Sequence, residues 1–272
     1  MPRPAWQGGG AFSTESGFDY STTKGTALTA GGSAHVLGSV VELLSAADNL
    51  YQSSGLTVII FTDPVAEARF QIVLTMGADD VPFLWDLYAS ESATTADGES
   101  VFQYNFPIGI PSGVKIGAQV RSTTASEVAT VAIIRSVGGA PGYQFCYPIG
   151  SDPAATAGTT VARTSSNTFG GWVEMDPSIP YAIKGFAVAG IKDAGSWSEA
   201  NISYQVGVGA AGEEIIIRSG DLIRQLAREA TSNAVSPFVP VGVAAGQRIA
   251  MRAQSSVNDI DSDLDYIIYG VA

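Results

Sequence analysis

"FPIGIPSGVKIGAQVRS", residues 106–122, and "VPVGVAAGQRIAMRAQS", residues 239–255, are two versions of one pattern within a single chain. A proline, two glycines, an isoleucine and the final serine hold the same places in both, so that Ile116 matches Ile249 at a spacing of 133 positions. Landmarks elsewhere keep a spacing of 130–133, such as Tyr51 with Tyr181. Solenoid and propeller repeats run at roughly 20–50 residues, so this longer repeat indicates one whole domain copied once.

The repeat predicts the domain organisation of the 272-residue chain. We expect an N-terminal arm at 1–24, a first domain at 25–138, a linker at 139–157 and a second domain at 158–272. Each domain is long enough to bury its own core. With 46% hydrophobic and 15% charged residues, the composition is that of an ordered globular protein.

Apolar and polar residues alternate in both copies. In "ARFQIVLTM", residues 68–76, and "ANISYQVGV", residues 200–208, every second side chain is apolar, and Ile116 and Ile249 are expected to face inward. Period-two alternation predicts antiparallel strands with one solvent-facing side, on which the first copy would place Arg69, Gln71, Thr75, Lys115, Gln119 and Arg121.

Turn signals complete the fold prediction. Gly113 and Gly246 stand where a hairpin turn requires a positive φ. We therefore predict an all-β protein with two tandem antiparallel β-sandwich (jelly-roll-like) domains from an internal duplication, preceded by an N-terminal arm. The exception is "SGDLIRQLARE", residues 219–229, whose apolar spacing predicts a short helix.

Charge and hydropathy argue against two classes of partner. The formal net charge is −12, and the 14 Lys and Arg residues are scattered singly, whereas nucleic-acid binding needs a clustered basic face. The start "MPRPAWQGGG" lacks the apolar core of a signal peptide, and no window reaches the roughly 18 apolar residues of a membrane span. We expect a protein that is not Sec-exported and binds neither nucleic acid nor membrane.

No catalytic, cofactor or metal site is predicted. His35 and Cys146 are the only residues of their kinds, so one chain cannot build a histidine-based triad or a multi-histidine metal site. Cys146 is expected to be a buried apolar residue. The GxGxxG pattern at 207–212 is followed by the strand-like "EEIIIRSG", which favours a turn over a nucleotide site. Glu42 and Glu174 hold matching places as charges flanking strands.

The sequence contains one acidic run, "NDIDSDLDY", in which four aspartates occupy every second position: Asp259, Asp261, Asp263 and Asp265. Crowded oxygen ligands of this kind could hold Ca²⁺, but the run lacks the glycine and terminal glutamate of an EF-hand loop. A solvated start to a strand is the favoured interpretation.

Aromatic residues mark candidate contact sites. The Gly/Ser/Thr-rich arm carries Trp6, Phe12, Phe18 and Tyr20, which we expect to dock on a neighbouring subunit. Trp85 and Trp172 lie in strand-like sequence, whereas Trp197 lies in the polar loop "DAGSWSEA" and is the candidate for glycan stacking.

The tandem sandwiches, the arm and the strand pair repeated at 106–122 and 239–255 together resemble the virion surface proteins of tailed bacteriophages. That family includes head decoration and cement proteins, head spikes, collar proteins and tail fibres. The resemblance implies a non-enzymatic structural protein of the virion, displayed on the head or neck and assembled in the host bacterial cytoplasm.

The partners implied are capsid, neck or tail subunits and further copies of the chain. The alternative is a tail-fibre or receptor-binding module that contacts a host-surface glycan. A glycoside-active enzyme is a third possibility, because sequence alone does not show which of the 26 acidic residues approach one another.

Overall fold

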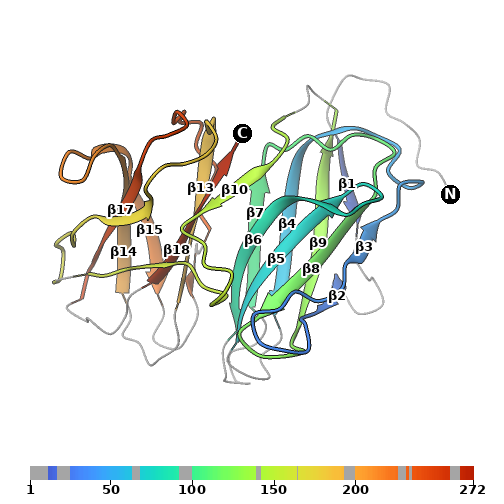
Figure 1. Ribbon diagram of the computed structural model, residues 1–272, viewed down its shortest axis with the longest axis horizontal. Coiled ribbons are helices and arrows are strands. Elements are labelled where there is room, and N and C mark those ends of the chain that lie inside the picture. Colours follow the sequence, from blue (N-terminus) through green and yellow to red (C-terminus); the bar gives the residue numbers. More distant parts are fainter. Residues whose placement is uncertain are drawn as a thin grey trace.

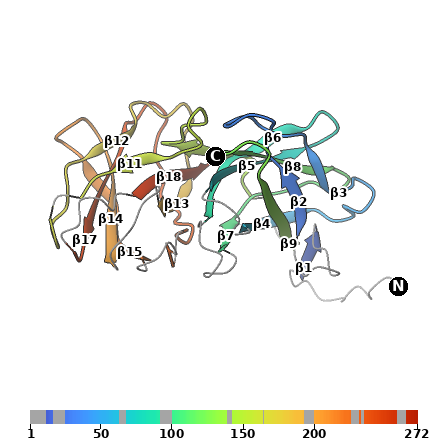
Figure 2. The same ribbon diagram turned by 90° about the horizontal axis from the view of Figure 1, so that it is seen from below.

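The computed structural model describes residues 12–16, 25–62, 68–91, 100–138, 142–163, 165–192, 200–225, 231–232, 235–257 and 264–272. These residues form strands, bridges and turns without any helix, so none of them belongs to a helix able to cross a membrane. The strands build two sandwiches that lie side by side (Figures 1 and 2).

The first sandwich has two sheets. One runs in the order β2 (Thr26–Thr29), β9 (Val128–Val137), β4 (Ser53–Thr62) and β7 (Ser100–Phe106), with β1 (Phe12–Ser16) beside β2 along β9. The other runs in the order β3 (Val41–Leu44), β8 (Ile116–Ser122), β5 (Ala68–Met76) and β6 (Val81–Glu91).

The second sandwich repeats this order. One sheet runs β12 (Val173–Asp176), β17 (Ile249–Ser255), β14 (Ala200–Val208) and β15 (Ile215–Gln225), ending in β16 (Thr231–Ser232). In the other, β18 (Leu264–Val271) pairs with β11 (Thr159–Val161) and β13 (Gly185–Lys192), and bridges from β13 to Val235 and Val239 take the place of β7. The matching strand orders confirm the predicted duplication and fold class. Below, two residues are called equivalent when they hold the same place in these two sets of strands.

Strand β10 (Cys146–Ile149) joins the two sandwiches. It pairs antiparallel with β18 of the second and parallel with β6 of the first, at Cys146 and Leu84. An eight-stranded sheet therefore runs through both sandwiches. The segment predicted as a linker thus contains a strand that pairs on both of its sides.

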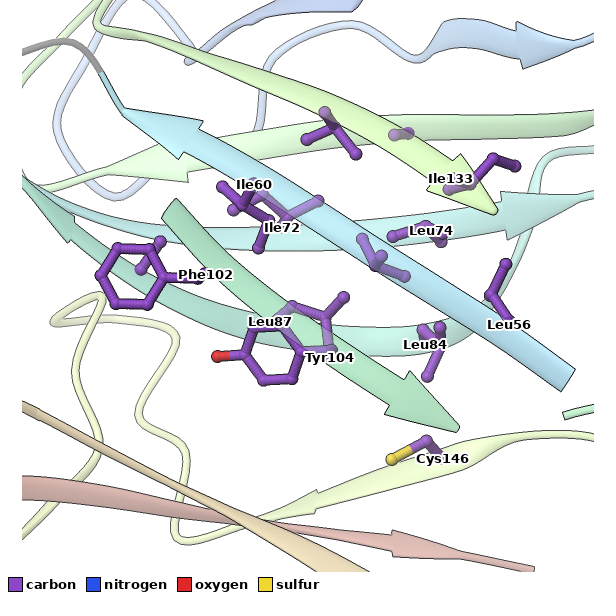
Figure 3. Close-up of a cluster of buried hydrophobic side chains, with 14 of the residues drawn as sticks. Leu56, Ile60, Ile72, Leu74, Leu84, Leu87, Phe102, Tyr104, Ile133 and Cys146 are labelled. Atoms are coloured by element: carbon purple, nitrogen blue, oxygen red, sulfur yellow. The ribbon is translucent and has the colours of Figure 1, made fainter. Parts of the chain in front are cut away.

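Each sandwich encloses an apolar core. Side chains from β4, β5, β6 and β7 meet in the first core, and Cys146 of β10 points into it from the side (Figure 3). Residues of the second repeat, including Ala187 and Ile267, complete this first core. The second core gathers around Ile202, Tyr204 and Ile268. The equivalent residues Ile116 and Ile249 are both buried, as predicted.

The predicted turns are confirmed and the predicted helix is wrong. Gly113 and Gly246 adopt φ values of 72° and 82°. Gly209 and Gly212 also have positive φ and lead into strand β15, which confirms the turn interpretation of GxGxxG. Residues 215–225 form a strand because they pair with β14 along its whole length. This tertiary pairing overrides the local helical spacing.

The outer face of the first sandwich is covered, contrary to the expectation of a solvent-facing side. Gln71 and Thr75 of β5 are fully buried. Gln71 Nε2 donates to the carbonyl oxygen of Ala157 at 2.9 Å and to Ser151 Oγ at 3.1 Å. Residues 150–157, part of the predicted linker, therefore pack across this face and satisfy its polar groups.

Candidate functional site

An aromatic cleft of about 830 Å³ lies where the two sandwiches meet. We call it the junction cleft. It is lined on the first sandwich by Trp85 and Gln52, on the connecting segment by Gln144, Phe145 and Tyr147, and on the second sandwich by Tyr181. Phe83 and several methionine, valine, proline and glycine residues complete a mostly apolar wall.

A bulge in β6 presents Trp85 to the cleft. Here Trp85 and Asp86 together oppose the single residue Val73 of β5, and Asp86 adopts a left-handed φ of 55°. Aspartate tolerates this region better than most residues, and both oxygens of its buried carboxylate are bound. Arg121 donates to one in an ion pair, and Ser151 Oγ donates to the other at 2.9 Å. A bulge of this kind re-aims a side chain and is frequent at binding sites.

The aromatic rings of the cleft contact one another edge to face. Phe145 lies 6.4 Å from Trp85 and 5.1 Å from Tyr181 between ring centroids, and Tyr147 lies 6.0 Å from Tyr181. Such pairs add stability beyond the area they bury. The cluster fixes four rings from three different segments into one wall.

Tyr147 also has a polar contact at the edge of the cleft. Its hydroxyl donates to Asp176 Oδ2 at 3.0 Å. Burial, and then the neighbouring Asp176 carboxylate, raise the pKa of Tyr147 to about 12, because both disfavour the phenolate. The phenol therefore stays neutral at physiological pH and acts as a hydrogen-bond donor.

The chemistry of the cleft suits binding. Among the described residues that line it, none is acidic, basic, histidine or cysteine. Flat rings offer stacking surfaces, and the exposed amides of Gln52 and Gln144 offer both donors and acceptors. An apolar wall with a few polar groups is the usual composition of a ligand site.

A second aromatic surface lies on the outer face of the second sandwich. The guanidinium of Arg252 lies 4.6 Å from the ring centroid of Trp172 and 5.0 Å from that of Phe169, and its Nε donates to Gln205 at 2.7 Å. The Trp172 ring also lies against Gly207, where a Cβ would approach it to 2.8 Å. Trp172 is thus held in a cation–π stack on this face.

Few of the site residues predicted from the sequence lie in the part of the chain that the structure describes. Trp6, Phe18, Tyr20, Trp197, Asp259, Asp261 and Asp263 lie outside the described residues, and Phe12 begins β1. The fourth aspartate, Asp265, is buried: its carboxylate lies 3.2 Å from Arg69 and accepts from Thr160 Oγ1 at 2.7 Å. In the part of the chain that is described, no three His, Cys, Asp or Glu side chains gather into a metal-binding group.

The junction cleft was not predicted from the sequence. Phe145 and Tyr147 lie in "GAPGYQFCYPIGSD", residues 139–152, whose prolines and glycines indicated a connection. Its dense aromatic residues were a usable signal for a contact surface. Tyr181 had been matched with Tyr51 only as a landmark of the repeat.

No protein-family model matches this sequence, and no curated protein matches it significantly. Among solved structures, PNGF-II matches with a TM-score of 0.40 and 8% identity over 96% of this chain. This chain spans 64% of the PNGF-II chain. The tandem CBM22-1–CBM22-2 domains of Paenibacillus barcinonensis Xyn10C match with a TM-score of 0.29 and 11% identity, over 98% of this chain and 100% of theirs. The fold assignment rests on the sheets described above.

Proposed function

We propose that this chain is a non-enzymatic structural protein of a bacteriophage particle, displayed on the head or neck and acting by assembly with other virion subunits. The observation that carries the proposal is an unmatched surface on the second sandwich. In the first sandwich, the edge of β6 pairs with β10, and the outer face is covered by residues 150–157. In the second sandwich, no described strand pairs with residues 215–221 on the side opposite β14.

That open edge is apolar. Ile215 is 70% exposed and Ile216 is 44% exposed. Soluble proteins usually protect sheet edges with charge, proline or cover, because an exposed apolar edge pairs with other chains. The first sandwich covers the corresponding edge with β10, whereas residues 215–221 of the second sandwich have no described strand beside them. This difference supports assembly with another subunit.

The test is whether the chain is part of the particle. Density-gradient-purified particles of the phage that carries the coding sequence should contain the protein by mass spectrometry, and immunogold labelling should place it on the head or neck. Its absence from purified particles would contradict the proposal.

A second candidate function is glycan binding, favoured by the junction cleft. Trp85 and Tyr181 offer rings for stacking against a sugar, and the amides of Gln52 and Gln144 could bind its hydroxyls. The three tryptophans make a matched set for a glycan array. Loss of binding in Trp85→Ala would assign the cleft, loss in Trp172→Ala the outer face, and loss in Trp197→Ala the polar loop. A wild-type protein that binds no glycan would end this second candidate.

A further inference from the structure

We propose that copies of this chain associate head to tail by repeating, between chains, the junction that joins the two sandwiches within one chain. Strand β1 of one copy would pair with the free edge of β15 in the next copy. This inference rests on the proposed assembly function and names the partner as a second copy of the chain.

The junction within the chain defines the contact. Strand β10 pairs with β18 on one side and with β6 on the other. The residues that follow it bind the outer face of the first sandwich, where Ser151 donates to Asp86 and Thr156 Oγ1 lies 3.0 Å from His35 Nδ1. A strand and the turn after it thus act together as one docking element.

Strand β1 is the equivalent of β10. It pairs with β9 as β10 pairs with β18, on the same side as the strand that follows it in the chain. The residues after it also match: "GFDYSTTKG", residues 17–25, and "GSDPAATAG", residues 150–158, share Gly, Asp, Thr and Gly at positions one, three, seven and nine. The first sandwich therefore begins with its own copy of the docking element, and no described strand pairs with the outer edge of β1.

Strand β15 is the equivalent of β6, the strand that receives β10. Both end the same four-strand order, and both carry a bulge, at Asp86 in β6 and at Gly220 in β15. The exposed Ile215 and Ile216 stand where Val81 and Pro82 line the junction cleft. The second sandwich thus presents residues 215–221 of β15 as a receiving edge, while β16 pairs with β15 at Arg224 and Gln225.

The copy that contributes β1 also carries the equivalents of the aromatic pair that closes the junction cleft. Phe12 is the equivalent of Phe145, and the exposed Tyr51 is the equivalent of Tyr181. Phe145 and Tyr181 contact each other at 5.1 Å within the chain. Phe12 and Tyr51 would supply the same pair to the contact between chains.

A single chain cannot make this contact with itself. Strands β1 and β15 lie in different sandwiches and are well separated (Figure 1). The edge of β1 and the edge of β15 are different surfaces, so the association is heterologous. It forms either a closed ring or an extended row.

The first experiment tests the register. In the chain, Cys146 lies opposite Leu84, and the equivalent pair between chains is Ser13 with Arg218. We expect Ser13→Cys combined with Arg218→Cys to form disulfide-linked dimers and higher species under mild oxidation, whereas each single variant does not. Cys146 is buried and serves as an internal unreactive thiol. Absence of interchain disulfides at all protein concentrations would overturn the inference.

The second experiment tests the edge. Ile215→Lys with Ile216→Lys places charge on the receiving strand and should weaken self-association at least tenfold in light scattering and sedimentation. Val101→Lys, at an exposed apolar position on β7, is the matched control and should leave association unchanged. Self-association that resists the double lysine variant would overturn the inference. A chain that binds purified particles but neither self-associates nor cross-links would also overturn it, while leaving the proposed assembly function intact.

Discussion

The two sandwiches share one strand order but differ in what covers their outer faces. In the first, polar residues of β5 such as Gln71 are fully buried beneath residues 150–157. In the second, the equivalent face holds the partly exposed Arg252 between two aromatic rings. Inward-facing residues preserved the fold after duplication, whereas outward-facing residues diverged. One face became an internal junction, whereas the described residues leave the other partly exposed.

The bulge in the last strand shows this divergence at a single position. Asp86 in β6 occupies a left-handed conformation, and its equivalent in β15 is Gly220. Gly220 has no side chain that could reach a neighbouring segment. Asp86 instead uses its side chain to bind Arg121 and Ser151, and so connects the bulge to the covering segment.

Asp86→Asn should have the largest effect on the stability of the junction. The substitution keeps the shape and the tolerance for a left-handed φ but leaves the buried Arg121 without its carboxylate. Removing one partner of a buried ion pair costs about 3–5 kcal/mol. Urea denaturation measures the loss, and Asp80→Asn, at the more exposed pair with Lys115, should cost much less. Equal losses for the two variants would show that the buried pair has no special role.

The fold could be predicted from the sequence more fully than the candidate site. Alternation and turn glycines depend on local chain geometry, and they identified Ile116, Ile249, Gly113 and Gly246 correctly. The junction cleft depends on which segments meet in space. Tyr181 comes from a loop more than thirty residues after Phe145, and no local pattern records their contact.

Matched core substitutions test whether the shared sheet couples the two sandwiches. Ile116→Ala and Ile249→Ala each remove an equivalent buried side chain and should each cost about 3 kcal/mol. Strand β10 pairs with both halves, and residues of β13 and β18 complete the first core. We therefore expect one cooperative thermal transition, whose midpoint temperature is lowered by either variant. Two calorimetric transitions, each sensitive to only one variant, would show that the sandwiches unfold independently.

Alkaline pH should destabilise the junction through Tyr147. Its folded pKa of about 12 lies above the ordinary tyrosine value of about 10, so the folded state holds its proton more tightly than the unfolded state. This contribution is fully present below pH 10 and is lost as the pH rises towards 12. The urea midpoint of the wild type should therefore decrease as the pH rises from 10 to 12. Tyr147→Phe should make this decrease of the midpoint with pH less steep. An unchanged slope would assign the alkaline loss to other groups.

The smallest expected effect is that of replacing the two hairpin glycines, which hold equivalent places in the two copies. Gly113 and Gly246 have left-handed φ values of 72° and 82°, and an added Cβ would meet no atom within 4 Å at either position. Backbone strain alone should then make Gly113→Ala and Gly246→Ala each cost about 1 kcal/mol. Gly32→Ala is the control, because Gly32 has open space without a left-handed φ, so alanine there should be neutral or slightly stabilising. Unequal losses at the two hairpins would mean that the surrounding loops, which lie at different distances from the junction, have diverged along with the outer faces.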